Sequence, residues 1–469
     1  MNRLVYLIVV VSFLFTSCKK DSYITSPGAN LQAGVDTLRF DTVFTSVGSI
    51  TQSLILSNPN SGKLLLGKLK LGGGANSPFK INVNGTPGIE FSNIEMNAND
   101  SIYVFVRVTV DPNQATNPFV LLDSIEINFN GKTSKVYLQA YGQNARFINH
   151  QKITTNTTWN NSLPYVIQND FEVSTGATLT IEKGTKVYVN ARAAFVINGS
   201  LQVNGGKDAI DHVVFKSDRL DAAYKDLPGS WPGIVFTEKS RNNELTFADI
   251  FNAYQALVVL GGFNQIPARL QLRQCQISNA YDIGVYGLNA SISAVNCLIS
   301  QCGNDGEAGI GGSNVLLSGG GKYDFENCTI ATYANLYQNH KQPVCFISNS
   351  AGGISSGLSA NFSNCIIYGQ GGNAENELQV QKASNDLVVF SNCLYMLKND
   401  PAGVVFTDCL KNSDPLFDSI STGRQQFNFR LKEGSPAIDA GRNTAVLIDL
   451  DGNSRISGTK TDMGCYEKQ

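Results

Sequence analysis

The chain repeats one short pattern five times, as Gln274-Cys275-Gln276-Ile277, Asn296-Cys297-Leu298-Ile299, Asn327-Cys328-Thr329-Ile330, Asn364-Cys365-Ile366-Ile367 and Asn392-Cys393-Leu394-Tyr395. Successive cysteines in these repeats lie 22, 31, 37 and 28 residues apart. A parallel β-helix uses roughly 20 to 25 residues for each coil, so the longer intervals leave a surplus that forms loops. The repeats therefore predict a parallel β-helix in the second half of the chain.

We expect the five repeated cysteines to point into this β-helix. Each coil adds about 4.8 Å along the axis, so equivalent thiols would stack as small apolar groups. The preceding Asn is expected at a bend, where stacked side-chain amides hydrogen-bond into a ladder. Neighbouring thiols on parallel strands in register seldom bridge, so these five are predicted to be reduced. Any disulfide is expected among the remaining cysteines beyond the leader, which are Cys302, Cys345, Cys409 and Cys465.

The composition favours β structure and argues against binding of nucleic acid and of zinc. The chain has 44 Gly and only 16% charged residues, and stretches of strong helix formers are almost absent. A formal net charge of -2 predicts no nucleic-acid partner, because proteins that bind nucleic acid present a basic surface. The three histidines, His150, His212 and His340, are widely scattered and no CxxC motif occurs, so no zinc site is predicted.

The first residues have the pattern of an export signal. An uncharged apolar run from Leu4 to Phe15 suits a signal peptide and is too short to span a bilayer as a helix. It leads into Phe15-Thr16-Ser17-Cys18, which resembles the lipobox of bacterial lipoproteins, with Phe15 where Leu is usual. The resemblance implies that residues 1–17 are removed and that Cys18 is acylated and tethers the chain to a membrane through residues 18–30. An ordinary secretory signal with an incidental cysteine is the alternative.

The residues after Cys18 bear on localisation. Lys19 stands where some bacterial lipoproteins carry the Asp that retains them in the inner membrane. The run Lys19-Lys20-Asp21 partly resembles the surface-export tethers of Bacteroidota lipoproteins. These resemblances imply a lipid-anchored protein of the cell envelope, in the outer membrane rather than the inner, with outward exposure as a further expectation.

Residues 31–147 alternate apolar and polar residues in short bursts. Strand-like segments are separated by Asn-Pro, Gly-Gly, Asp-Pro and Asn-Gly turns, and they lie at 54–56, 64–71, 79–83, 102–110, 125–129 and 136–141. About seven such strands in one short domain suit a β-sandwich. The order of features from Asp41-Thr42-Val43-Phe44 to Val136-Tyr137-Leu138 resembles Hydin-like immunoglobulin domains, which implies a spacer or interaction module.

Residues 148–469 carry two further resemblances. Segments 164–167, 176–187, 197–205 and 231–236 resemble the first coils of bacterial right-handed β-helix proteins of the pectate-lyase-like type. From about residue 412, the segments 414–417, 427–431, 434–441, 449–455 and 462–467 resemble the C-terminal ending of the choice-of-anchor Q type. We expect this ending to cap the last coil and to hide an open sheet edge.

Right-handed β-helices include polysaccharide lyases and hydrolases, so the predicted fold is compatible with catalysis by paired carboxylates or by calcium beside a basic residue. The candidate pairs are Asp305 with Glu307, Glu375 with Glu377, and Asp324 with Glu326. Such pairs are common by chance, and the alternative is that each is simply exposed to solvent without a catalytic role. The sequence therefore leaves the catalytic residues unknown.

A weak calcium candidate lies near the C-terminus. Asp449, Asp451 and Asn453 place oxygen atoms at alternating positions, but the bidentate Glu of an EF-hand loop is missing. The favoured interpretation is a turn in which these side chains bond their own backbone. No cofactor is predicted, with Ca²⁺ as the exception left open.

Three tyrosines are the candidate ligand-binding residues. Tyr254 and Tyr281 each follow Asn-Ala in successive coils, and Tyr333 falls near the same place two coils later. Aligned rings on a coiled surface suit stacking against sugar faces, although a tyrosine ladder also stiffens a solenoid. We expect an envelope lipoprotein whose β-helix is a non-catalytic binding surface for a polysaccharide or a surface protein. A polysaccharide lyase or glycoside hydrolase with its site in the loops is the alternative.

Overall fold

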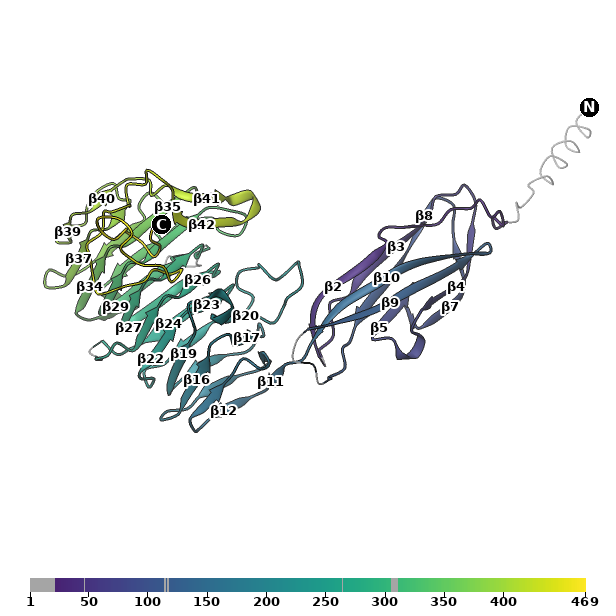
Figure 1. Cartoon of the computed structure of the whole chain (residues 1–469), viewed down its shortest axis with the longest axis horizontal. Coiled ribbons are helices and arrows are strands. Elements are labelled where there is room, and N and C mark those ends of the chain that lie inside the picture. Colours follow the sequence, from purple (N-terminus) through teal and green to yellow (C-terminus); the bar gives the residue numbers. More distant parts are fainter. Residues whose placement is uncertain (1–21, 46, 114, 116–117, 264, 305–310) are drawn as a thin grey trace, which may run out of the picture. The chain divides into compact units, whose positions relative to one another are not determined.

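The computed structural model describes residues 22–45, 47–113, 115, 118–263, 265–304 and 311–469 (Figure 1). Cys18, the predicted acylation site, lies outside the described residues. The chain is almost entirely β and divides into two compact units, the first ending at Asn144 and the second beginning at Ala145. The predicted all-β class is therefore confirmed.

The first unit is a sandwich of two five-stranded sheets around one core. The first sheet has the order β1 (Gln32–Ala33), β3 (Gln52–Asn58), β8 (Asp100–Val108), β5 (Phe79–Val83) and β6 (Thr86–Gly88). The second has the order β2 (Thr37–Phe44), β10 (Lys132–Gln143), β9 (Phe119–Phe129), β4 (Leu64–Leu71) and β7 (Glu90–Met96), and a short 3-10 helix, η1, covers Gly74–Asn76. Inward residues such as Val104 and Ile127 are fully buried between the sheets while their neighbours face solvent, which is the alternation that the sequence predicts.

The second unit is a parallel β-helix. One sheet of 11 strands contains β11 (Arg146–Ile148), β14 (Tyr165–Ile167), β17 (Lys186–Val189), β20 (Val213–Ser217), β23 (Ala248–Phe251), β26 (Gln276–Ser278), β28 (Leu298–Ser300), β30 (Thr329–Tyr333), β35 (Ile366–Gln370), β38 (Leu394–Tyr395) and β40 (Leu410–Lys411). Each of these strands pairs in parallel with the next strand of the sheet, one coil further along the chain. Figure 1 shows the coils stacked in chain order from β12 to β39.

The rest of the β-helix wall is a sheet of 17 strands. It contains β12 (Gln151–Ile153), β13 (Thr157–Trp159), β15 (Phe171–Val173), β16 (Thr178–Glu182), β18 (Phe195–Ile197), β19 (Ser200–Asn204), β21 (Ile234–Phe236), β22 (Asn243–Thr246), β24 (Gln255–Leu260), β25 (Leu270–Arg273), β27 (Ile283–Val295), β29 (Val315–Glu326), β31 (Cys345–Ser348), β34 (Leu358–Ser363), β36 (Leu378–Gln381), β37 (Leu387–Ser391) and β39 (Val405–Thr407). The remaining elements are two hairpins, β32 (Ser350–Ala351) with β33 (Ile354–Ser355) and β41 (Phe417–Ser421) with β42 (Gln426–Leu431), and the 3-10 helices η2 (Ala209–Asp211) and η3 (Thr422–Arg424).

The predicted column of thiols is confirmed. Cys275, Cys297, Cys328, Cys365 and Cys393 are fully buried, and each thiol contacts the next one in the series. The column has one more member than predicted, because the Cys393 thiol also contacts Cys409 in the last coil. All nine described cysteines are free thiols, so the four to which any disulfide was assigned, Cys302, Cys345, Cys409 and Cys465, form none.

Thiol labelling tests this column. Burial raises the pKa of Cys302 to about 12, whereas a hydrogen bond with Cys393 lowers the pKa of the partly exposed Cys409 thiol to about 7. We expect a thiol reagent near neutral pH to modify Cys409 before any other described cysteine, as read by peptide mass spectrometry, and Cys409→Ser to remove this fast reaction. Fast modification of Cys328 or Cys365 in the native protein would contradict the buried column.

The residue before each cysteine is correctly placed at a bend, but the predicted amide ladder is wrong. Asn296, Asn327, Asn364 and Asn392 all adopt φ near +52°, a left-handed conformation that Asn tolerates better than most residues. Their amides do not bond one another. The amide of Asn364 donates to the carbonyl of Arg442 at 2.8 Å and accepts from its N–H at 2.9 Å, and Asn392 donates to the Ala440 carbonyl at 3.4 Å. Asn296, Asn364 and Asn392 thus hold a different part of the chain, the C-terminal segment of residues 412–469, whereas the buried amide of Asn327 has no hydrogen-bond partner among the described residues.

The C-terminal segment lies along the flank of the β-helix and not across its end. Outward side chains of the 11-stranded sheet form a second hydrophobic cluster with this segment, and its members include Leu298, Ile366 and Leu394 on the sheet and Phe417 and Met463 on the segment. Strands β39 and β40 remain the last strands of their sheets among the described residues. The expected covering of that edge is therefore not observed, because the apolar surface that attracts the segment is on the side of the coils.

Candidate functional site

Tyr254 and Tyr281 form an aromatic platform where two successive coils leave the 11-stranded sheet. Each follows an Asn with positive φ and an Ala that is buried in the core, so the turn directs both tyrosines outward. Their rings stack with centroids 5.5 Å apart and planes inclined by 17°. Tyr254 is 47% exposed, and Tyr281 is half-buried. The predicted alignment of these two residues is confirmed, and we call the pair the tyrosine platform.

Tyr333 does not belong to this platform. It ends β30, is only 7% exposed, and packs between Tyr368, Phe417 and Phe429 with ring centroids 6.0 to 6.4 Å away. Burial raises the pKa of its hydroxyl. The expectation that Tyr333 shares one surface with Tyr254 and Tyr281 is wrong, because its ring points to the flank that the C-terminal segment covers.

Asp449, Asp451 and Asn453 are engaged with the protein itself. The buried carboxylate of Asp449 accepts hydrogen bonds from the backbone N–H groups of Asn453 at 2.8 Å and Glu467 at 3.0 Å. Asp451 forms a two-pronged ion pair with Arg430, whose Nε lies 2.7 Å from Oδ2. Within the described residues no three His, Cys, Asp or Glu side chains come together as metal ligands. The carboxylate oxygens of Asp449 and Asp451 thus satisfy backbone and guanidinium donors.

The carboxylate pairs considered for catalysis are separated or solvated. Asp324 and Glu326 share the outer face of β29, as alternate residues must, but they lie beside Ser293, Asn361 and other uncharged neighbours. Glu375 is exposed and pairs with Lys398 at 2.7 Å, whereas Glu377 is buried against His340 at 2.9 Å. Asp305 and Glu307 lie outside the described residues.

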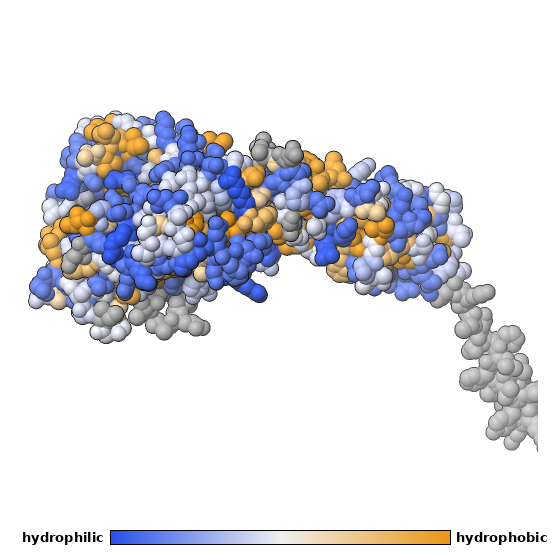
Figure 2. Space-filling model, turned by 90° about the horizontal axis from the view of Figure 1, so that it is seen from below, coloured by the Kyte–Doolittle hydropathy of each residue, from blue (hydrophilic) through white to orange (hydrophobic). Residues whose placement is uncertain are grey.

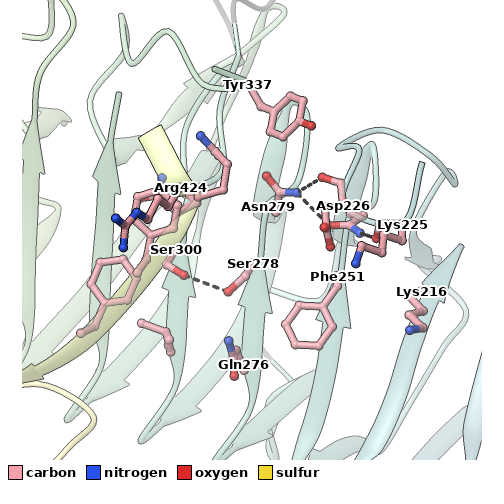
Figure 3. Close-up of a pocket in the computed structure, with 16 residues that line it drawn as sticks. Lys216, Lys225, Asp226, Phe251, Gln276, Ser278, Asn279, Ser300, Tyr337 and Arg424 are labelled. Atoms are coloured by element: carbon pink, nitrogen blue, oxygen red, sulfur yellow. Dashed lines mark hydrogen bonds between the residues drawn. The ribbon is translucent and has the colours of Figure 1, made fainter. Parts of the chain in front are cut away.

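The structure presents a pocket that the sequence did not indicate. It has a volume of about 440 Å³ and opens on the outer face of the 11-stranded sheet, so we call it the flank pocket (Figure 3). Lys216, Phe251, Gln276 and Ser278 project into it from β20, β23 and β26. Arg424 and Phe427 reach it from the hairpin β41–β42 and its 3-10 turn, about 150 residues later in the chain.

The flank pocket lies at the border of the sheet surface on which the C-terminal segment packs. In the strand register, outward Gln276 is followed by Leu298, Thr329, Ile366 and Leu394. At this position of the register, polar Asp249 and Gln276 are thus followed by mostly apolar residues on the later coils. An apolar residue pointing outward is stable only under a cover. This change in outward polarity is the sequence signal that would have placed both the cover and the pocket.

A histidine–aspartate pair at the 11-stranded sheet allows a pH test. His212 Nδ1 lies 3.0 Å from Asp249, which is next to Gln276 in the strand register, and this contact raises the pKa of His212. The pair therefore stabilises the fold at pH values below the ordinary pKa of about 6.5, and this contribution is lost as the pH rises through the raised pKa. We expect an NMR titration of His212 to show a raised pKa that falls in Asp249→Asn. An unchanged midpoint in that variant would contradict the pair.

Two surface features complete the description. On the face shown in Figure 2, hydrophobic residues of the β-helix unit form small patches separated by polar residues, so that face carries no extensive apolar docking surface. In the part of the chain that the structure describes, no helix has the length and apolar character needed to cross a membrane.

Comparisons with known proteins leave the family open. No family model matches the chain, and no curated protein matches it. Among solved structures, the chain is similar over a short stretch to a family 123 glycoside hydrolase from Clostridium perfringens, at 12% sequence identity and a TM-score of 0.18. The match covers 24% of this chain and 26% of the hydrolase.

Proposed function

We propose that this protein is a lipid-anchored envelope protein whose β-helix binds a glycan without cleaving it. The observation that carries the proposal is the tyrosine platform. Its two stacked rings offer apolar area next to solvent, and sugar rings present flat apolar faces that pack on such surfaces. The turns that carry the rings are bonded to each other, because the N–H of Tyr281 donates to the Ala253 carbonyl at 2.8 Å and the N–H of Asp282 donates to the Tyr254 carbonyl at 2.9 Å.

The rest of the proposed chain organisation rests on sequence resemblance. Cys18 would carry the lipid, and the Hydin-like sandwich would hold the β-helix away from the membrane surface. The ending similar to the choice-of-anchor Q type corresponds to the C-terminal segment that packs on the β-helix flank. The residues after Cys18 support the proposal of an outer-membrane position with outward exposure, and protease treatment of intact cells tests it.

Binding to a panel of soluble polysaccharides, measured by retardation in affinity electrophoresis, tests the proposed function. We expect at least one glycan to retard the wild-type protein. Tyr254→Ala should weaken that binding by about 1 kcal/mol, or roughly fivefold, because one stacking surface is lost.

Tyr103→Ala is the matched control. Tyr103 is 49% exposed on the sandwich and stacks on Phe105 with centroids 6.2 Å apart, so this variant also removes an exposed stacked tyrosine. Its glycan binding should equal that of the wild type. If Tyr254→Ala lowers the melting temperature without changing binding, the tyrosines only stiffen the coils and the proposal is wrong.

A polysaccharide lyase is the second candidate, and one observation favours it. The flank pocket places a carboxylate, Asp226, near Lys216, and burial together with neighbouring lysines lowers the pKa of that lysine. An amine with a lowered pKa is a better proton acceptor near neutral pH. Degradation assays on acidic polysaccharides, with and without calcium, separate the two candidates, since binding alone releases no new chain ends.

A further inference from the structure

The flank pocket has an excess of positive charge. Lys216, Lys225 and Arg424 line it, and Asp226 is its single carboxylate. In Figure 3 the two lysines lie on one side of Ser278 and Gln276, and Arg424 lies on the other side. The pocket thus carries positive charge at both of its ends.

These cations are not neutralised by the protein. No ion pair or side-chain hydrogen bond joins Lys216, Lys225 or Arg424 to another described residue. By contrast, lysines elsewhere in the β-helix, such as Lys152 and Lys183, reach a carboxylate at 2.9 Å. Lys216 is also half-buried, with its ammonium 5.6 Å from the ring of Tyr188. A partly desolvated cation without a partner favours a ligand that brings negative charge.

The remaining lining suits a sugar. The amide of Gln276 has no hydrogen-bond partner among the described residues, and Ser278 bonds only Ser300, at 2.8 Å between hydroxyl oxygens. Phe251, Tyr337 and Phe427 contribute rings to the pocket walls. Unpaired amides and hydroxyls next to aromatic rings match the alternating polar edge and apolar face of a pyranose. A volume of about 440 Å³ is within the ordinary range for small-ligand sites.

We propose that the flank pocket binds an acidic saccharide, with anionic groups near Lys216 and Lys225 at one end and near Arg424 at the other, and with sugar rings against Gln276, Ser278 and Phe427 between them. This inference rests on the proposed glycan-binding function and specifies the charge of the ligand and a second site for it. Because Arg424 and Phe427 belong to the C-terminal segment, the site is complete only when that segment is docked on the β-helix flank.

Calorimetric titration of the purified protein with matched probes tests the inference. The probes are a neutral oligosaccharide, the same backbone carrying uronic acids, the same backbone carrying sulfate esters, and inorganic sulfate alone. We expect the wild type to prefer one acidic probe over the neutral one by at least roughly tenfold, and to lose affinity as salt is added. Lys216→Met and Arg424→Gln should each weaken acidic binding roughly tenfold and leave neutral binding unchanged.

Lys322→Met is the matched control, since Lys322 is an exposed strand lysine on the other sheet of the same β-helix. Equal affinity for neutral and acidic probes, with no effect of the lysine and arginine variants, overturns the inference while the glycan-binding function stands. Tight binding of sulfate alone overturns the saccharide assignment in favour of a small-anion site. No binding of any saccharide overturns the proposed function and the inference together.

Discussion

Replacing Phe362 by Ala is expected to lower the free energy of unfolding of the β-helix by about 3–5 kcal/mol, the usual cost of removing a buried aromatic ring. Phe362 is fully buried and stacks between Phe325 and Phe390, with ring centroids 4.8 and 4.9 Å away, and Phe390 in turn stacks on Phe406 at 5.2 Å. The substitution leaves a cavity in the middle of this column, and neighbouring coils cannot collapse into it without losing their strand register.

Chemical denaturation measures this loss, and hydrogen exchange of the C-terminal coils is the readout of their unfolding. Phe406→Ala is the matched control, because Phe406 ends the same column and is only half-buried. It should cost clearly less than Phe362→Ala. Equal losses at the two positions would mean that the column is not packed as a continuous stack.

The aromatic column also shows how far the sequence alone could reach. The thiol column was predictable because a cysteine preceded by Asn, or once by Gln, recurs in five places with enough residues between them for whole coils. A Phe stands three residues before four of the column cysteines, at Phe325, Phe362, Phe390 and Phe406, and this second regularity fixes the same register. Cys409 was not assigned to the column because Asp408, and not Asn, precedes it. Asp408 nevertheless adopts the same left-handed conformation, with φ of +50°.

The candidate site was less predictable than the coils. Tyr254 and Tyr281 could be paired because each follows the same Asn-Ala turn, and local sequence determines such turns. Tyr333 resembled them in spacing only, since its coil carries a longer strand, β30, that turns the ring toward the flank. The flank pocket was not predictable, because Lys216 and Arg424 are separated by some 200 residues and meet only through the docking of the C-terminal segment.

Docking of the C-terminal segment depends on one buried arginine. Arg455 is 1% exposed, and its guanidinium bonds the side chain of Asn296 on the β-helix, at 3.1 Å from Nε, and the Gly464 carbonyl at 2.8 Å. Its other nitrogen, Nη1, lies 3.6 Å from the buried carboxylate of Glu467. Asn296 precedes a column cysteine, so Arg455 joins the C-terminal segment to the repeated bend of the coils.

Arg455→Met is therefore expected to destabilise the docked segment by about 3–5 kcal/mol, because it leaves Glu467 buried without a counter-charge. Hydrogen exchange and limited proteolysis of residues 412–469 should report the loss locally while the coils stay protected.

Burial already raises the pKa of Glu467, and removal of Arg455 should raise it further. A carboxyl whose pKa is raised in the folded state binds more protons when folded than when unfolded, so its burial costs less stability as the pH falls. The loss of stability caused by Arg455→Met should therefore shrink as the pH falls from about 8 toward about 5. The double variant Arg455→Met with Glu467→Gln should recover most of the loss at neutral pH. A defect that is independent of pH and of Glu467 would mean that Arg455 acts only through its packing and its bond to Asn296.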